Sequence, residues 1–316
     1  MSAVVGVDLA LIVLLVALAW WILAARDAFA AIAGFVAYGL VLMLAWMRLA
    51  GPDVALTEGA IGSGLSGLML FGAAARLRRK GHEAATASPS AGTAMRVGVG
   101  LLCAGVVAAL AAIVLELPEP APTLAPQAAA SLGATRLGNP VTGVLLAYRA
   151  LDTLLEKVVL FLALIGVWSL APDRAWGGAP RIPSVESHGA LRLLAQVLPP
   201  FGILVGIHMV WNGADAPGGA FPGSAVLAAM WMLALAAGLT RLPAVSCRRL
   251  RTAIIIGPAV FLLVAFAGFG LAGAFLAYPD GWAKPLIVAI ELPLILSIAV
   301  ILTLLIAGPP ETEVRP

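Results

Sequence analysis

Residues 48–67 read RLAGPDVALTEGAIGSGLSG, a stretch in which two carboxylates stand between apolar runs. Gly51 and Pro52 interrupt the preceding run, so a new helix can begin there with Asp53 in its first turn, where the helix dipole favours an anion. Glu58 follows about one and a half turns deeper, without a basic residue close to it in sequence. Asp53 is either a simple helix cap or part of a site, and Glu58 is either structural or a proton-exchanging group. Small residues recur every four positions after Glu58, which favours close helix packing: Gly59, Ser63 and Gly67.

The composition around this stretch is that of a membrane protein. Hydrophobic residues make up 62% of the 316 residues and charged residues 11%, whereas a soluble domain carries about 25% charged residues. A soluble chain of this length would need far more polar surface. The chain is therefore predicted to be an all-α, polytopic bundle of transmembrane helices.

Apolar runs long enough to cross a bilayer, which takes roughly 20 residues, occur about nine times along the chain. The first run lacks a preceding basic segment and is followed at once by Arg26 and Asp27, so we predict a retained span rather than a cleaved signal. The predicted spans are residues 7–25, 28–47, 54–75, 96–116, 153–171, 190–211, 219–240, 252–276 and 285–307.

The distribution of basic residues predicts how these spans are oriented. Cytoplasmic loops are enriched in Lys and Arg, and most of the 19 basic residues fall on one side when residues 76–80 are placed in the cytoplasm. Alternation from there puts the N-terminus outside and the C-terminus inside. The net charge of +3 reflects this orientation signal and does not indicate nucleic-acid binding.

A second group of charges lies in NPVTGVLLAYRALDTLLEKVV, residues 139–159. Arg149, Asp152 and Glu156 are spaced three and four residues apart, so they are predicted to share one helical face. They form either a salt-bridge cluster near the membrane interface or a proton relay that leads into the span. Lys157 is expected to point elsewhere or to extend its ammonium group toward the interface.

A third candidate site is IHMVWNGADAPGGAFPGSAV, residues 207–226. Glycines and prolines after Asn212, including Gly218 and Gly219, leave backbone groups free at the end of a span. Such irregular backbone is tolerated at membrane depth where it lines a cavity or is buried in protein. His208, the one histidine predicted within a span, is either a proton-passing group or a hydrogen-bonded core histidine.

The last predicted span contributes one more acidic residue, Glu291, and Pro293 beside it removes a backbone hydrogen bond that could open a polar pocket. Acidic residues inside spans are costly and by default suggest a function. Elsewhere the two cysteines are isolated and the three histidines are dispersed, so no metal-ligand spacing is present. The sequence also contains no nucleophile–base pair, phosphate loop or redox-cofactor motif, so we predict no metal, no cofactor and no enzymatic activity.

Two polar stretches, residues 81–94 and 172–189, divide the predicted spans into three blocks, and each block contains a motif that resembles a known module. GPDVALTEGAIGSGL (51–65) resembles the signature of MbhD-type domains, and NPVTGVLLAYRALDTLLEKVVL (139–160) resembles the MbhE-type segment. NGADAPGGAFPGSAVLAA (212–229) resembles the MnhB/MrpB domain, which is of the MbhF type. In this order the three are similar to a fused subunit of an Mrp-type Na⁺/H⁺ antiporter, with modules at 1–80, 94–172 and 188–310.

This resemblance also implies roles for particular residues. The conserved membrane carboxylates of the first two modules fall on Glu58 and Glu156, and Asp152 falls on the Asp-Thr pair of the second. The third module departs from its usual His-Asn sequence around Asn212, and Glu291 stands where an aspartate followed by glycine is expected. The family's large antiporter-like subunit, with its channel lysines, is not represented, so a separate partner subunit is expected.

We therefore expect a subunit of a multisubunit cation/proton antiporter or complex-I-related pump, multi-pass in the bacterial cytoplasmic membrane. Its carboxylates would relay protons, with Na⁺ as a second candidate ion. Its expected partners are the lipid bilayer and other membrane subunits of the complex, and not nucleic acid. Two alternatives stay open: a structural scaffold that docks an antiporter-like partner, and a membrane-arm subunit of a redox-driven complex such as a membrane-bound hydrogenase.

Overall fold

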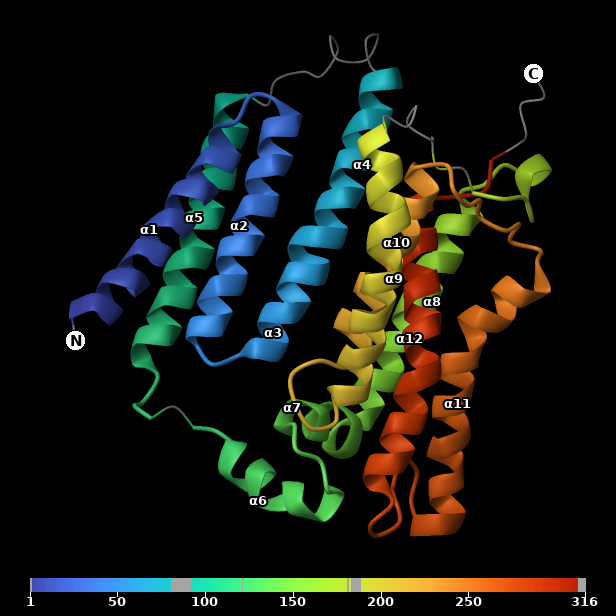
Figure 1. The fold of residues 1–316 in the computed structure, drawn as a ribbon. Coiled ribbons are helices and arrows are strands. Elements are labelled where there is room, and N and C mark those ends of the chain that lie inside the picture. Colours follow the sequence, from blue (N-terminus) through green and yellow to red (C-terminus); the bar gives the residue numbers. More distant parts are fainter. Residues whose placement is uncertain (1, 81–91, 121, 181, 183–188, 312–316) are drawn as a thin grey trace.

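The computed structural model describes residues 2–80, 92–120, 122–180, 182 and 189–311, and within them every regular element is a helix (Figure 1). The predicted all-α, polytopic membrane bundle is thereby confirmed. The predicted linker at residues 81–94 lies mostly, and the one at 172–189 partly, outside the described residues.

The first block is a helical hairpin followed by a broken helix. α1 (Ser2–Ala24) packs against α2 (Ala28–Arg48), and a third helix follows in three parts: α3 (Pro52–Thr57), η1 (Glu58–Leu65) and α4 (Ser66–Lys80). Asp27 begins α2 by accepting a hydrogen bond from Ala30 N at 2.9 Å. At the other end of the hairpin, Arg48 Nε pairs with Asp8 Oδ1 at 2.9 Å. The predicted helix start at Pro52 is confirmed.

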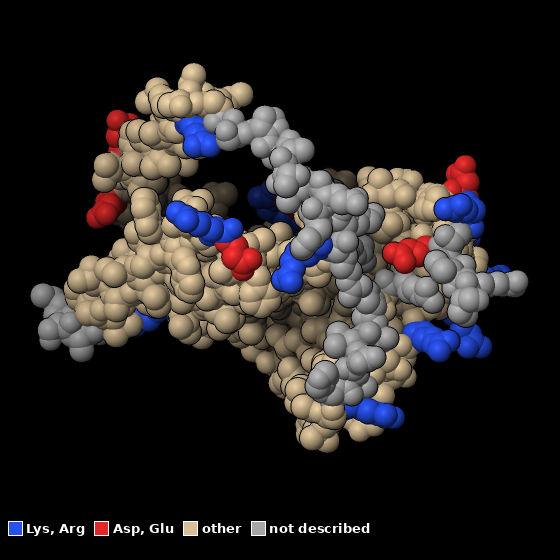
Figure 2. Space-filling view, turned by 90° about the horizontal axis from the view of Figure 1, so that it is seen from above, with Lys and Arg blue, Asp and Glu red and all other residues tan. Residues whose placement is uncertain are grey.

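The second block contains α5 (Thr93–Glu116), α6 (Ala125–Thr135), α7 (Pro140–Gly143), η2 (Val144–Tyr148) and α8 (Ala150–Ser169). No residue of α5 is buried, so this apolar helix exposes its whole circumference. Figure 2 shows an opening in the molecule when it is seen from the end at the top of Figure 1. Unlike α5, α8 buries one side against the last block, where it contacts α11 and α12.

The last block forms the core, with η3 (Asp173–Ala175) leading to α9 (Gly189–Asn212), α10 (Ala220–Ala236), α11 (Arg248–Ala272) and α12 (Ala283–Ala307). α12 is the central helix, because it is largely buried and packs against α8, α9, α10 and α11. α11 approaches it closely at Gly257, whose N–H donates to Ser297 Oγ at 2.9 Å. Ser297 Oγ in turn donates to Ala253 O at 2.8 Å. Small residues and interhelical hydrogen bonds of this kind hold helices together in lipid, where the hydrophobic effect between helices is absent.

Seven of the nine predicted spans correspond to helices that are long and apolar enough to cross a membrane: α1, α2, the continuous helix from Pro52 to Ala75, α5, α9, α11 and α12. The other two coincide with α8 and α10. α8 has 20 residues but carries Asp152, Glu156 and Lys157, and α10 is apolar but has only 17 residues. Both α8 and α10 contribute to the charged site described below. Because they are not among the seven candidate spans, the count of nine spans stays a prediction.

The π-helical segment η1 is stabilised by its own hydroxyl groups. π-Helical turns displace carbonyls from the usual hydrogen-bond pattern and often mark functional positions. Ser63 Oγ donates to Glu58 O at 3.2 Å, and Ser66 Oγ donates to Ile61 O at 2.9 Å. The backbone beside Glu58 is therefore irregular but satisfied, which membrane depth requires.

The second π-helical segment, η2, is satisfied from farther along the chain. Thr153 Oγ1 donates to Leu145 O at 2.6 Å, and Tyr278 Oη donates to Leu146 O at 2.8 Å. Tyr278 lies in the connection between α11 and α12, and burial raises the pKa of its phenol above the ordinary value. The phenol therefore stays protonated and remains a hydrogen-bond donor to η2.

Figure 2 shows from above the end of the bundle that is uppermost in Figure 1, and several Lys and Arg side chains are visible at separate places on it. Arg248, Arg249 and Arg251 lie in the first turn of α11. Arg174 and Arg241 lie in the neighbouring connections. This end is the one that the sequence predicts to be cytoplasmic, and the orientation of the chain stays a prediction.

The contact between α11 and α12 generates a stability prediction. A Cβ atom at Gly257 would lie 2.9 Å from Leu294 Cα and 2.7 Å from Ser297 Oγ. Gly257→Ala should therefore push the two helices apart and destabilise the protein by about 1–3 kcal/mol. The measurement is the thermal unfolding of the purified protein in detergent. Gly270→Ala, also in α11 but with nothing within 4 Å of its Cβ position, is the matched control and should leave stability unchanged or slightly increased. Equal unfolding temperatures for the two variants would contradict the close approach.

Candidate functional site

Three segments that are far apart in the sequence meet at Asp53, at the end of the bundle that is lower in Figure 1. Asp53 Oδ1 accepts hydrogen bonds from Asn139 Nδ2 at 3.2 Å and from Gly218 N at 3.1 Å. The three residues belong to α3, to the start of α7 and to the loop between α9 and α10. Asp53 lies in the first turn of α3 as expected, but it makes no capping hydrogen bond there. Its observed contacts join the three predicted blocks of the chain.

Asn139 is the centre of this junction and is almost fully buried. Its Nδ2 also lies within hydrogen-bonding distance of Gly213 O (3.2 Å) and Ala216 O (3.1 Å), while its Oδ1 caps α7 by accepting from Val141 N at 2.9 Å. Sequence reasoning did not single out Asn139 as a site residue. The Asn-Pro pair does signal a helix start, but the loop carbonyls that Asn139 binds come from more than 70 residues later in the chain.

Two further contacts fix the loop between α9 and α10 at this junction. Thr142 Oγ1 donates to Gly213 O at 2.7 Å, and Lys284 Nζ pairs with Asp215 Oδ1 at 2.6 Å. Asp53, Asn139 and Asp215 line a cavity of about 240 Å³ beside the loop. The irregular backbone after Asn212 is therefore bound by protein groups and borders a cavity, which is the setting in which membrane proteins tolerate it.

Glu58 lies in a separate, half-buried position between η1 and α2. A Cβ atom at Gly39 of α2 would lie 3.2 Å from Glu58 Oε1, and one at Gly62 would overlap the same oxygen. The two glycines therefore leave the space that the carboxylate fills. Within the described residues, no side chain forms an ion pair or hydrogen bond with this carboxylate.

Lys157 is buried, so it does not extend toward the interface, and of the two expectations only the one that it points away from the face of Arg149, Asp152 and Glu156 remains. Its side chain is 3% exposed, and its Nζ lies 3.2 Å from Glu156 Oε2 and 3.6 Å from the centroid of the Phe221 ring. The reason is the orientation of α8, which turns Lys157 toward α10 and α12 and leaves Glu156 49% exposed at the edge. A positive charge at this depth is retained only where carboxylates and an aromatic face compensate it.

Glu291 lies on α12 and is also 3% exposed. Its Oε1 accepts a hydrogen bond from Ala220 N at 3.2 Å, where α10 begins after Gly219 with φ of +103°. Its Oε2 is buried and has no hydrogen-bond partner among the described residues. Lys157 and Glu291 interact electrostatically without forming a direct ion pair. The structure thus brings Glu156, Lys157 and Glu291 into one cluster, which we call the buried charge cluster.

The remaining predicted site residues lie outside this cluster. Arg149 Nη2 pairs with Asp152 Oδ2 at 2.5 Å, three residues apart as expected, and both side chains are largely exposed at the start of α8. Glu156 does not continue this ladder, because it pairs with Lys157 instead. His208 is exposed on α9 and, within the described residues, forms no ion pair with a carboxylate.

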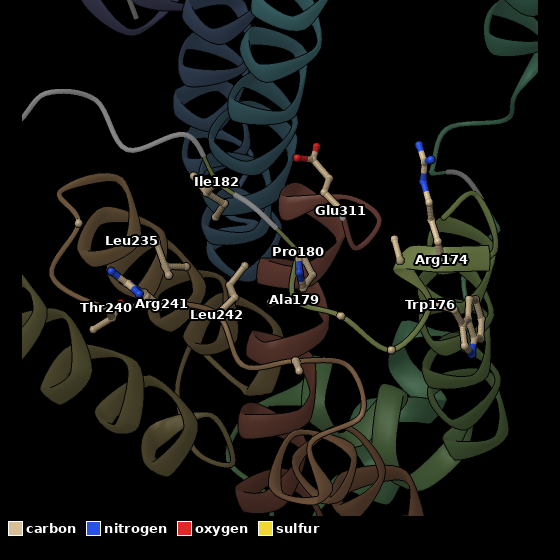
Figure 3. Close-up of a pocket in the computed structure, with 15 residues that line it drawn as sticks. Arg174, Trp176, Ala179, Pro180, Ile182, Leu235, Thr240, Arg241, Leu242 and Glu311 are labelled. Atoms are coloured by element: carbon tan, nitrogen blue, oxygen red, sulfur yellow. The ribbon is translucent and has the colours of Figure 1, made fainter. Parts of the chain in front are cut away.

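A larger cavity of about 830 Å³ lies near the basic end of the bundle (Figure 3). It is lined by the connection after α8, the connection before α11 and Glu311. Arg174 and Arg241 lie at opposite sides of the view and do not converge on a common point. None of the predicted site residues lines this cavity, so it is not part of the candidate site.

Two family descriptions match parts of the chain. The MbhD family, which is named for a component of MBH, matches residues 13–79, and the domain related to the MnhB subunit of Na⁺/H⁺ antiporter matches residues 190–308. Glu58 lies within the first match and Glu291 within the second. The resemblance to MbhD and MnhB modules is thereby confirmed, and the MbhE-like module at residues 94–172 stays a prediction.

Two solved structures share the fold. One is a chain of the Mrp complex from Dietzia sp. DQ12-45-1b, with a TM-score of 0.73 and 23% identity over 97% of this chain and 35% of that chain. The other belongs to the membrane-bound sulfane sulfur reductase (MBS), an archaeal respiratory membrane complex, with a TM-score of 0.56 and 22% identity over 67% of this chain and 97% of that chain. This chain thus spans about a third of the length of the Mrp-complex chain. A search of curated proteins gave no significant match.

The junction at Asn139 generates a second prediction. Asn139→Ala removes the amide that binds two buried loop carbonyls and Asp53, so it should destabilise the protein by about 1–3 kcal/mol through unpaired polar groups. Gln127→Ala removes an exposed amide from α6 and is the matched control. Thermal unfolding in detergent measures both effects. If Asn139→Ala unfolds at the temperature of the control, the junction does not hold the blocks together.

Proposed function

We propose that this chain, parts of which match the MbhD family and the MnhB-related domain, is a fused subunit that provides part of the ion route in a multisubunit Mrp-type cation/proton antiporter or a related membrane complex. The observation that carries this proposal is the buried charge cluster of Glu156, Lys157 and Glu291. Ionisable residues at membrane depth are costly and typically mark ion or proton pathways. The cluster draws its charged side chains from α8 and α12 and the supporting ring of Phe221 from α10.

Glu58 provides a second station on the proposed route. Its carboxylate occupies the space left by Gly39 and Gly62 beside a π-helical turn, without a compensating positive charge among the described residues. Such a carboxyl can take up and release a proton without first breaking an ion pair. The π-helical backbone of η1 packs against α10, the helix that also carries Phe221, so the two stations share a supporting element.

The chain is proposed to act together with other membrane subunits, including a larger antiporter-like subunit, in the bacterial cytoplasmic membrane. The exposed apolar faces of α1 and α5 support this, since each offers a full helix length for contact with lipid or neighbouring helices. Any redox chemistry of a related complex would lie in other chains. Protons are the proposed cargo because carboxylates and a lysine can exchange them directly, and Na⁺ is the second candidate.

A scaffold role is the alternative function, and one observation favours it. The junction of Asp53, Asn139 and the loop between α9 and α10 is well satisfied by hydrogen bonds, which is typical of a structural contact. The two functions are separated by whether the carboxyls of Glu58 and Glu156 are needed for transport.

The third prediction concerns these carboxyls. Glu58→Gln and Glu156→Gln keep the shape of the side chain but remove its ability to carry a proton, so each should lower cation-dependent proton flux at least about tenfold. Flux is measured with a pH-sensitive dye in inverted vesicles that contain the whole complex, and assembly is checked by native electrophoresis. Glu119→Gln, in the exposed connection after α5, is the matched control and should retain wild-type flux. Normal flux in both test variants would reduce this chain to a scaffold.

A further inference from the structure

The geometry of the buried charge cluster points to a specific step in transport: we propose that Lys157 carries protons between Glu156 at the edge of the bundle and Glu291 in its centre. This inference rests on the proposed function, because it assigns one step of the same route. Sequence reasoning gave Lys157 only a supporting role. Its burial among partners from α8, α10 and α12 gives it a central one.

The first argument is the position of the ammonium group between two unlike carboxylates. Glu156 is about half exposed at the outer side of α8, whereas Glu291 is almost fully buried on α12. Lys157 Nζ pairs with Glu156 Oε2 at 3.2 Å, whereas Glu291 forms no direct ion pair with it and contributes only a weaker electrostatic attraction. A proton that moves from Glu156 to Glu291 therefore passes from the periphery of the bundle to its interior.

The second argument is an unused acceptor at the inner end. An ammonium group has three donors, and Lys157 places one of them on Glu156 and rests on the face of Phe221. Glu291 Oε2 is buried without a hydrogen-bond partner among the described residues. Leaving a buried carboxylate oxygen without a hydrogen bond costs free energy. The Lys157 ammonium, whose charge acts on Glu291, is the group that can provide this bond.

The third argument is that the first turn of α10 contacts both Lys157 and Glu291. Ala220 and Phe221 are consecutive residues in the first turn of α10. The N–H of Ala220 holds Glu291 Oε1, and the ring of Phe221 supports the Lys157 ammonium. One turn of helix thus positions both groups, and the flexible four-carbon stem of lysine allows the ammonium to move across the ring toward Glu291.

The transfer is balanced by ordinary proton chemistry. When the ammonium reaches Glu291, an N–H bond of Lys157 breaks and an O–H bond forms at Glu291 Oε2, leaving a neutral amine and a neutral carboxylic acid. With the ammonium gone, the half-exposed Glu156 carboxylate takes up a proton from the outer side of α8. The amine swings back and takes that proton, so an O–H bond of Glu156 breaks and an N–H bond of Lys157 forms. One proton has then moved from Glu156 to Glu291, and the reverse sequence carries it outward.

The test compares lysine with arginine, which keeps the positive charge but does not release its proton in proteins. In vesicles that contain the whole complex, Lys157→Arg should lower cation-dependent proton flux at least about tenfold while the complex still assembles. Lys284→Arg, at the exposed pair with Asp215, is the matched control and should retain wild-type flux. Wild-type flux in Lys157→Arg would overturn the proposal, because a fixed positive charge would then suffice.

A second variant keeps the proposal testable if arginine does not fit. Lys157→Gln combined with Glu291→Gln removes both buried charges together, so no buried charge is left uncompensated, and Glu156, which loses its partner, is half exposed. The proposal expects this double variant to assemble and to show at least about a tenfold loss of flux, whereas restored flux would overturn it. Loss of flux in Glu58→Gln and Glu156→Gln with normal flux in both Lys157 variants would refute the lysine step and leave the proposed function standing. Normal flux in the glutamate variants would refute the proposed function itself.

Discussion

The structure depends on one constraint: within the hydrocarbon region, backbone groups and charges have to find their partners inside the protein. The chain breaks its helices at Gly51-Pro52, at η1, at η2 and after Asn212. Side chains supply hydrogen bonds at these breaks, as Ser63 does for η1, Tyr278 for η2 and Asn139 for the loop before α10. The helix interruptions therefore require the blocks to pack together, because several of the partners come from different parts of the chain.

This constraint explains why α12 lies at the centre. Polar groups on α12 would have no partners if this helix faced lipid. Its neighbours α8, α9, α10 and α11 surround it and supply those partners. Glu291 is compensated by Ala220 N of α10 and by the charge of Lys157 on α8. Ser297, less than two turns farther along the helix, joins α12 to α11 through Gly257. The same helix thus holds the most buried carboxylate and the closest helix contact described above.

The sequence predicted the helical class, the break before Asp53 and the Arg149–Asp152 pair, because each depends on local spacing or composition. It did not predict the burial of Lys157, since α8 is apolar on most sides and adjacent residues such as Glu156 and Lys157 face different directions. The role of Asn139 was equally hidden, because its loop partners lie more than 70 residues away. Glu291 was chosen correctly as an intramembrane acid, but nothing local to it indicated Ala220 or Lys157 as neighbours. What the sequence could not supply is which faces of apolar helices meet.

The Asp53–Asn139 junction and the buried charge cluster differ in how completely their polar atoms are paired. This difference indicates which of the two is structural and which is suited to transport. At the Asp53–Asn139 junction, each described donor has an acceptor, and Asp53 Oδ1 accepts from two donors. In the buried charge cluster, Glu291 Oε2 has no hydrogen-bond partner among the described residues, while the Lys157 ammonium, whose charge acts on Glu291, is bound to Glu156. A fully satisfied buried network rigidifies and specifies a unique arrangement, whereas an unpaired buried oxygen leaves an acceptor to which a donor can still move. A proton route needs groups that can change partners, so the incompletely paired cluster is the part of this chain whose chemistry is suited to movement.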